Sequence, residues 1–196
     1  IYDKTGTVLL YDVHGDVRRT VVPFEEIPRA VKNATVIIED ANFYNHHGID
    51  ISAVFRAVIV NLLSGDFTQG GSTITQQLVK NAILTREKTI SRKLKELVLA
   101  LKVERTYSKE RILELYLNEI PYGSSAYGIA AAAEVYFGKK LDALTLAEAA
   151  YLAALPRAPT YYSPYGAHRD KLDERKNLVL RRLHDHDFIA TEEYDN

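Results

Sequence analysis

The chain has 196 residues, enough for one domain that buries about 70% of the surface of its unfolded state. It contains no cysteine, which excludes disulfide bonds and thiolate metal sites. Its 25 basic and 26 acidic residues give a net charge of -1, so the overall charge does not favour nucleic acid as a partner.

The start of the chain carries no signal peptide, and no apolar run is long enough to predict a membrane-spanning helix. The chain begins at Ile1 without an initiator methionine. This suggests a piece cut from a longer protein, which could have carried a membrane anchor upstream.

The predicted elements are mainly helical. Residues 1–26 form a small N-terminal β hairpin, with strands at 7–12 and 17–22 around the turn sequence HGD. Residues 27–196 form one helical domain, as their apolar periodicity indicates. Its helices are predicted at 27–39, 52–63, 73–84, 89–106, 109–120, 124–140, 146–155 and 170–186.

Capping residues support several of these boundaries. Ser72 and Ser108 are predicted N-caps, Thr145 with Glu148 forms a capping box, and Gly138 ends a helix. The helix at 52–63 is apolar almost all round, so it is expected either to be deeply buried or to meet lipid. Gly65 is its predicted stop, and the segment 64–71 is predicted to be a mobile loop.

The first candidate site lies in the stretch EDANFYNHHG, where Glu39 ends the first predicted helix. Apolar neighbours would partly desolvate its carboxylate, which suits it to proton transfer. Asp40 is the next residue, and a negative charge on one of these two carboxylates disfavours a charge on the other. Such a pair alone is usually a solvated helix end, but Phe43, His46 and Gly48 follow closely and favour a functional site.

The two adjacent histidines do not predict a metal centre. His46 and His47 point in different directions on a regular backbone, and no third ligand follows at a metal-site spacing. We expect one of them to orient a loop or a carboxylate through a hydrogen bond, with Gly48 permitting the turn.

Two further clusters supply polar and cationic groups. In GGSTITQQLVKN, two glycines precede a helix N-terminus, whose free N–H groups favour an anion. The side chains that follow are Ser72, Thr73, Thr75, Gln76, Gln77 and Lys80. In SRKLKE, Arg92 and Glu96 are four residues apart on one helix face, beside Lys93, and these cations would suit a diphosphate.

The last two clusters favour structural roles. Glu114 lies in a largely apolar helix, where an acid usually needs a cationic partner. Arg175 lies in RKNLVL and is expected to fix a carboxylate or to be solvated.

In this order, the clusters resemble the five motifs of the peptidoglycan glycosyltransferase family (family 51), the lysozyme-like domain of class A penicillin-binding proteins. EDANFYNHHG resembles E-D-x-x-F-x-x-H-x-G, and GGSTITQQ resembles G-x-S-T-I-T-Q-Q. RKLKE, KERILELYLN and RKNLVL resemble R-K-x-x-E, K-x-x-I-L-E-x-Y-L-N and R-x-x-x-V-L. Five motifs in order are far more specific than any one. The N-terminal hairpin looks more like the bifunctional branch of the family.

The resemblance implies an inverting polymerisation of lipid II, with Glu39 as the general base and Glu96 as the second acid of the cleft. Residues implied to bind substrate or its diphosphate are Asp40, Phe43, His46, Ser72, Thr73, Gln76, Gln77, Lys80, Arg92 and Lys93. Those implied to support the site are Gly48, Glu114, Asn118 and Arg175. No cofactor is required by the sequence, although Mg²⁺ or Mn²⁺ could bind at the substrate diphosphate.

The same resemblance places the chain at the outer face of the bacterial cytoplasmic membrane. An apolar lobe at about residues 50–71 would lie in the interface through Val54, Phe55, Val58, Leu62 and Phe67. The implied partners are lipid II, the growing glycan strand and a moenomycin-type inhibitor. A transmembrane anchor and a transpeptidase domain are expected in the full-length protein.

Two other functions are compatible with parts of the sequence. A glycoside hydrolase would use the paired carboxylates, but a soluble one would not need the cations and the apolar helix. A non-catalytic module that docks partners through the apolar helix would not depend on Glu39.

Overall fold

The computed structural model describes residues 18–64, 70–84 and 89–195. Its helices are α1 (Arg29–Glu39), α2 (Ile51–Ser64), α3 (Ile74–Ala82), α4 (Ile90–Thr106), α5 (Lys109–Glu119), α6 (Ile129–Phe137), α7 (Leu146–Ala154), α8 (Arg169–Asp185) and α9 (Thr191–Asp195). Short 3-10 helices lie at Phe24–Glu26, Phe43–Asn45 and Leu141–Ala143. The described chain is therefore mainly α, as the sequence predicts.

A small sheet joins the start of the described chain to its middle. Strands β2 (Pro121–Gly123) and β3 (Ala126–Tyr127) pair antiparallel, and β1 (Arg18–Arg19) pairs parallel to β3. Of the predicted hairpin, the first strand lies outside the described residues, and only β1 remains of the second. The prediction of a continuous helix from residue 124 was wrong, because Ala126 and Tyr127 form β3 and α6 begins at Ile129.

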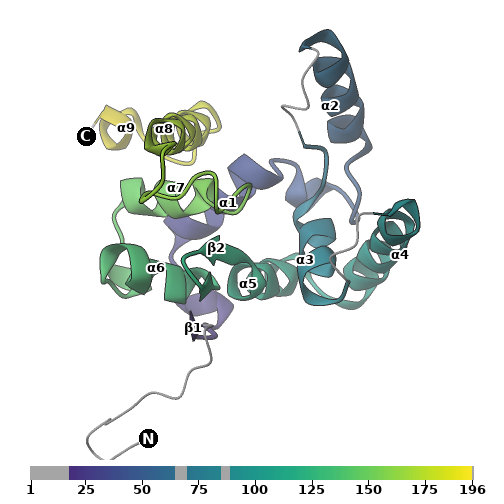
Figure 1. The fold of residues 1–196 in the computed structure, drawn as a ribbon, viewed down its shortest axis with the longest axis horizontal. Coiled ribbons are helices and arrows are strands. Elements are labelled where there is room, and N and C mark those ends of the chain that lie inside the picture. Colours follow the sequence, from purple (N-terminus) through teal and green to yellow (C-terminus); the bar gives the residue numbers. More distant parts are fainter. Residues whose placement is uncertain (1–17, 65–69, 85–88, 196) are drawn as a thin grey trace, which may run out of the picture.

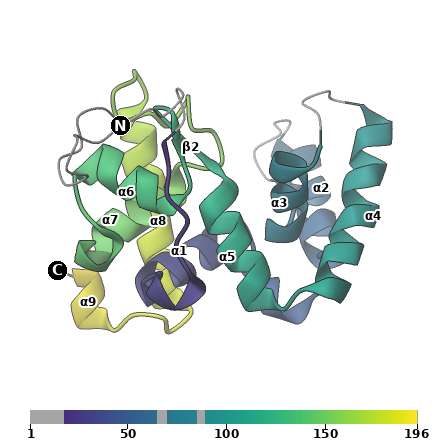
Figure 2. The same ribbon diagram turned by 90° about the horizontal axis from the view of Figure 1, so that it is seen from below.

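Helix α1 lies at the centre of the larger group of helices. It packs against α7 and α8, and its buried residues Ala34, Ile37 and Ile38 belong to the cluster that these helices share. Figure 2 shows α5 between this group and the smaller group of α2, α3 and α4. Glu39, the last residue of α1, therefore ends near the junction of the two groups.

Helix α2 stands away from the rest of the molecule (Figure 1). Of its described side chains, Ala57 is buried, whereas Phe55 is 65% exposed and Leu62 is 82% exposed. Ile51, Val54, Val58 and Ile59 are exposed as well. Of the two environments expected for this apolar helix, the structure excludes deep burial.

Most predicted caps are confirmed. Ser108 accepts a hydrogen bond from the Arg111 N–H, Thr145 and Glu148 form a capping box, and Gly138 ends α6 with a φ of 63°. The prediction for Ser72 was wrong, because Thr73 caps α3 through a capping box with Gln76. The sequence T-x-x-Q at residues 73–76 carries that signal.

Two predictions are untested or only partly tested, and one helix was missed. Gly65, Phe67 and most of the predicted loop at 64–71 lie outside the described residues. The division between residues 1–26 and 27–196 stays a prediction. Helix α9 was not predicted; it is short and polar and follows α8 closely.

Candidate active site

Glu39 is held by two donors at the C-terminal end of α1. The Gln77 side-chain amide donates to Oε2 at 2.8 Å, and Arg175 Nη2 donates to Oε1 at 3.0 Å. The Glu39 side chain is only 8% exposed. Because each carboxylate oxygen accepts a hydrogen bond from a different donor, the side chain of Glu39 is held in one orientation.

Gln77 and Arg175 are themselves held in place by further hydrogen bonds. The Tyr116 hydroxyl donates to Gln77 Oε1 at 3.2 Å, and Arg175 Nε donates to the Ala154 carbonyl at 3.0 Å. Burial, followed by the charge of Glu39, raises the pKa of Tyr116, so its hydroxyl keeps the proton it donates. Burial lowers the pKa of Arg175, while Glu39 acts in the opposite direction. The orientation of Glu39 thus depends on α3, α5, α7 and α8.

Asp40 and His46 contact each other in the turn that follows Glu39. His46 Nε2 lies 2.9 Å from Asp40 Oδ2, and its Nδ1 accepts a hydrogen bond from the Gly48 N–H at 3.2 Å. Asp40 also accepts from the Ile74 N–H at 3.0 Å, and Thr73 Oγ1 donates to the Gly48 carbonyl at 2.7 Å. The expectation that a histidine orients a carboxylate is confirmed, and these bonds attach the first cluster to the start of α3.

Phe43 lies in the core and does not reach a substrate surface. It is fully buried, and Lys109 Nζ lies 4.4 Å from its ring centroid. The structure therefore corrects its expected role from substrate contact to support. Lys109 also pairs with Glu104 at 2.8 Å, and Glu104 accepts a hydrogen bond from Thr75. Sequence reasoning missed this network, because Thr75 lies 29 positions from Glu104 along the chain.

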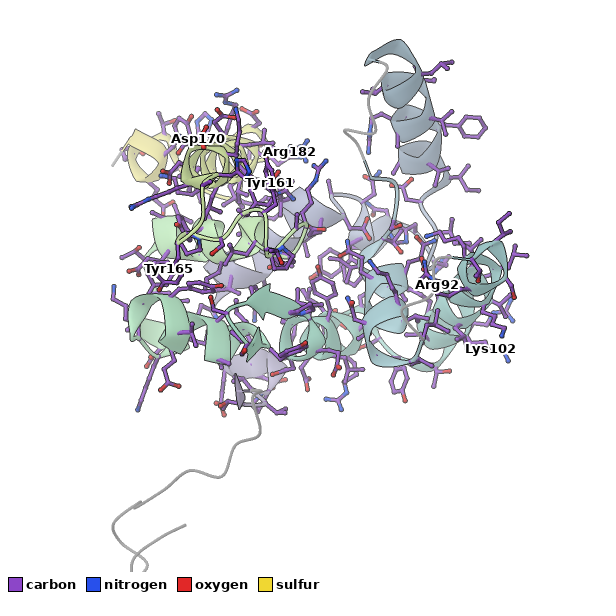
Figure 3. The ribbon with its side chains drawn as sticks, viewed as in Figure 1. Arg92, Lys102, Tyr161, Tyr165, Asp170 and Arg182 are labelled. Atoms are coloured by element: carbon purple, nitrogen blue, oxygen red, sulfur yellow. The ribbon has the colours of Figure 1, made fainter. Side chains whose placement is uncertain are left out.

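Glu96 forms the centre of a second charged cluster, on α4. It is 1% exposed and pairs with Arg92 at 3.3 Å and with Lys93. Lys93 Nζ also donates to Ser72 Oγ at 3.1 Å, so Ser72 contacts the cationic cluster instead of capping α3. The buried Nε atom of Arg92 has no hydrogen-bond partner among the described residues. Figure 3 shows Arg92 on α4.

Three adjoining cavities connect these clusters. The first holds Glu39, Asp40, Ser72, Thr73 and Arg175 in about 600 Å³. An apolar groove of about 440 Å³ beneath α2 shares Ser72 with it and is also lined by Gln76 and Lys93. The third, about 750 Å³, is lined by Lys80, Arg92 and Lys93. Lys80 therefore lies near the cations of α4. Gln77, in contrast, contacts Glu39.

Two predicted support residues act at a distance from Glu39. Asn118 donates to the Val22 carbonyl at 2.9 Å and accepts from the Val22 N–H at 2.8 Å, which anchors the N-terminal segment on α5. Glu114 has the expected cationic partner, because it pairs with Arg111. Neither residue lines the cavity that holds Glu39.

A family model described as Transglycosylase matches residues 7–184 of the chain. The chain belongs to the transglycosylase family. The resemblance read from the five motifs is therefore confirmed.

Relatives of this transglycosylase domain are longer proteins. The chain is 52% identical over its full length to penicillin-binding protein 1A of Aquifex aeolicus and 45% identical to penicillin-binding protein 1A of Escherichia coli. It spans 26% and 23% of their lengths. A crystal structure of penicillin-binding protein 1A from Haemophilus influenzae superposes with a TM-score of 0.55 at 29% identity, covering 92% of this chain and 17% of that one. This match confirms the predicted fold class.

The described part of the transglycosylase domain offers no metal centre. It contains no group of three His, Asp or Glu side chains placed to hold an ion. Within the same residues, no helix is long and apolar enough to cross a membrane.

Asp50 connects the transglycosylase site to α2. Its carboxylate accepts hydrogen bonds from Ser52 at 2.6 Å, from the Ala53 N–H at 2.9 Å and from Asn42 at 2.9 Å. Desolvation is the largest single influence on its pKa and raises it. The three hydrogen bonds and His46 outweigh that influence and lower the pKa to about 2.

We expect Asp50→Ala to lower the free energy of unfolding by about 1–2 kcal/mol at pH 7, because the start of α2 loses its cap. A lowered folded-state pKa stabilises the protein above the ordinary aspartate pKa, and this stabilisation is lost as the pH falls toward 2. The difference from wild type should therefore shrink between about pH 4 and pH 2 in urea unfolding. A difference independent of pH, or an equal loss in Asp170→Ala, would contradict this.

Proposed function

We propose that this domain polymerises lipid II, joining the anomeric carbon of a lipid-linked glycan to the 4-hydroxyl of the lipid II acceptor sugar. The observation that carries the proposal is the geometry of Glu39. Its carboxylate is fixed by Gln77 and Arg175 at the wall of a cavity large enough for a sugar. A sugar hydroxyl is a poor nucleophile, so it needs a base that is oriented and shielded from water.

In the proposed step, Glu39 accepts the proton of the acceptor hydroxyl. The hydroxyl oxygen attacks the donor's anomeric carbon from the face opposite the diphosphate, and a new glycosidic bond forms with inversion. The bond from the anomeric carbon to the diphosphate breaks, and undecaprenyl diphosphate leaves with its charge. The proton on Glu39 then passes to solvent.

The leaving diphosphate needs positive charge, which the α4 cluster supplies. Lys80, Arg92 and Lys93 line one cavity, and Lys93 reaches Ser72 at the edge of the Glu39 cavity. Glu96 holds Arg92 and Lys93 in place, and this supports a role for it as a positioning acid of the cleft. Fixed cations in a partly dry site stabilise developing charge better than water does.

A divalent cation would bind at this site only together with the diphosphate of the substrate. Mg²⁺ prefers several oxygen ligands, but Glu39 and Glu96 are already engaged by Arg175, Arg92 and Lys93. In this proposal Mg²⁺ or Mn²⁺ would be held mainly by the substrate's diphosphate oxygens and would neutralise part of their charge.

The exposed apolar face of α2 supports membrane association. Val54, Phe55, Val58 and Leu62 are exposed, and the groove beneath them leads to Ser72 and Lys93. An apolar helix face of this kind lies in the membrane interface without crossing it. We therefore propose that the domain works at the outer face of the cytoplasmic membrane, where lipid II presents its sugars.

The longer relatives support further proposals about the whole protein. We propose that it carries a membrane anchor and a transpeptidase domain, and that a moenomycin-type inhibitor occupies the lipid II cleft. The growing glycan strand is the second substrate, and nucleic acid is not an expected partner.

The proposed activity is tested by incubating the purified protein with lipid II in detergent, with and without Mg²⁺, and separating products by size on a gel. A ladder of glycan polymers is the expected result. If the protein is folded but makes no polymer, the proposal fails. Adding preformed glycan then distinguishes the two alternative functions. Shortened chains indicate a hydrolase, whereas unchanged chains indicate a docking module.

Lys93→Ala is expected to raise the KM for the lipid-linked donor about tenfold, because a charge-assisted bond to the diphosphate is lost. The effect should shrink at high salt, since the side chain is partly exposed. Lys95→Ala removes an equal charge from α4 outside the cavity of Lys93 and is the control. An unchanged KM in Lys93→Ala would remove this residue from the site.

A further inference from the structure

Glu104 on α4 is an acid that the proposed mechanism does not use, although its side chain is only 3% exposed. Lys109 Nζ lies 2.9 Å from one of its carboxylate oxygens and 2.8 Å from the other. The hydroxyl of Thr75, which is fully buried on α3, also donates a hydrogen bond to it. A buried charge is stable only when it is paired and hydrogen-bonded, so these contacts hold Glu104 in place.

The bond from Thr75 joins Glu104 to the residue that holds the proposed base. Thr75 stands just before Gln77 in the first turns of α3, and the Gln77 amide donates to Glu39 at 2.8 Å. The other end of the same amide accepts from Tyr116 at 3.2 Å. The position of α3 therefore decides where Gln77 meets Glu39, and the Thr75 hydroxyl attaches α3 to α4.

The turn that follows Glu39 rests on the same part of α4. A Cβ added to Gly48 would lie 3.1 Å from the carbonyl oxygen of Ala100 and 3.2 Å from Cγ of Glu104. The Gly48 carbonyl also accepts a hydrogen bond from Thr73, the N-cap of α3. The turn and the start of α3 are thus held to each other and to α4.

The charged cluster of the leaving group lies on the same helix as Glu104. Arg92, Lys93 and Glu96 come from the N-terminal half of α4, and α3 packs along this helix (Figure 2). Because an α-helix is stiff along its axis, a bond that fixes α3 on α4 also sets the distance from Gln77 to these cations.

We propose that the hydrogen bond from Thr75 to Glu104 positions Glu39 relative to the cations of α4, which makes Glu104 a positioning residue for polymerisation. This inference rests on the proposed function, because it concerns the base and the leaving-group cations of that reaction. Neither Thr75 nor Glu104 lines any of the three adjoining cavities, so both act through other residues. Misplacing reacting groups by about 1 Å can cost a rate factor on the order of a hundred.

The test compares two variants of Thr75, because a change of Glu104 would leave Lys109 without its partner. Thr75→Val keeps the shape of the side chain and removes the hydroxyl, whereas Thr75→Ser keeps the hydroxyl. With lipid II as substrate, Thr75→Val should lower kcat about tenfold, the effect of one charged hydrogen bond, and change KM less than about twofold. Thr75→Ser should keep kcat within about twofold of wild type.

Two controls separate positioning from packing and stability. Thr35 is also buried on a helix, but its hydroxyl has no hydrogen-bond partner within the described residues, so Thr35→Val should match wild type. Thr145→Val removes the N-cap of α7 and should lower stability without lowering kcat while the protein stays folded. A loss of kcat in either control as large as in Thr75→Val would overturn the proposal.

Three results for Thr75 itself would also overturn it. A kcat of Thr75→Val within about twofold of wild type would show that the bond to Glu104 does not position the site. Equal losses in Thr75→Val and Thr75→Ser would assign the effect to packing. A raised KM with an unchanged kcat would assign the Thr75 hydroxyl to substrate binding.

A measurement without turnover separates failure of this inference from failure of the proposed function. The side-chain amide of Gln77 reports its contacts with Glu39 and Tyr116 in the NMR spectrum of labelled protein, where its signals are identified by their loss in Gln77→Glu. Thr75→Val should shift or broaden these signals, and Thr35→Val should not. If wild type makes no polymer, the polymerisation proposal fails, and this spectrum still decides. Signals of Gln77 in Thr75→Val that coincide with those of wild type overturn the inference.

Discussion

Glu39→Gln is expected to reduce the polymerisation rate at least about a hundredfold, because general base catalysis typically contributes that much or more. Glutamine has nearly the shape of glutamate and can still contact Gln77 and Arg175. It cannot accept a proton from the acceptor hydroxyl at neutral pH. The rate is measured with labelled lipid II at saturation, and lipid II affinity is measured separately.

Two comparisons make this result specific to the base. Lipid II affinity and thermal stability should stay close to wild type in Glu39→Gln, so that the loss lies in turnover. Glu174→Gln removes an exposed glutamate that pairs with Lys171 and should leave the rate unchanged. Normal polymer from Glu39→Gln would remove Glu39 as the base.

Gly128→Ala should lower the free energy of unfolding by at least about 3 kcal/mol. Gly128 has a φ of 82° at the start of α6, and an added Cβ would lie 2.7 Å from the backbone carbonyl oxygen of Asn118. That carbonyl belongs to α5, so the contact is relieved only if two helices separate. Urea unfolding followed by circular dichroism measures the loss.

Gly138→Ala is the matched control, because Gly138 also has a positive φ of 63° but open space where a Cβ would stand. Only the backbone conformation is strained there, so its loss should be about 1 kcal/mol. Equal losses in the two variants would show that the contact with Asn118 does not limit stability.

The sequence predicts helices best where their signals are local. Ser108, Gly138 and the Thr145–Glu148 box act within a few residues of themselves, and each cap is confirmed. The strands at 121–127 were missed because they are short and contain Pro121 and Gly123. They are also completed by residues more than a hundred positions earlier in the chain.

The candidate site, too, was predicted only where its signals are local. The motifs identified Glu39, Gln77 and Arg175, but the sequence did not show which carboxylate Arg175 would bind, 136 positions away. Lys80 and Gln77 are three residues apart on α3, yet they belong to different clusters, because Gln77 reaches α1 and Lys80 lies with the cations of α4. The placement of Phe43 in the core also required tertiary packing, since an aromatic side chain close to Glu39 in the sequence suits either role.

The cavity of Glu39 is also lined by Arg56, Arg157 and Arg182, and nothing in the sequence indicated this. Arg56 stands in an apolar helix, Arg157 in a proline-rich segment and Arg182 on the final long helix, with no common spacing. The tertiary fold brings them to the cavity of Glu39. Such convergence of separated residues is invisible to periodicity.

The most direct test of the central claim is an analysis of the product linkage and of the released lipid when wild-type protein acts on lipid II. Transfer to a sugar hydroxyl predicts inverted glycosidic bonds by NMR and one undecaprenyl diphosphate released for each disaccharide added to the strand. Release of the lipid with free reducing disaccharide in equal amount would contradict the account, because water and not the sugar hydroxyl would then be the acceptor.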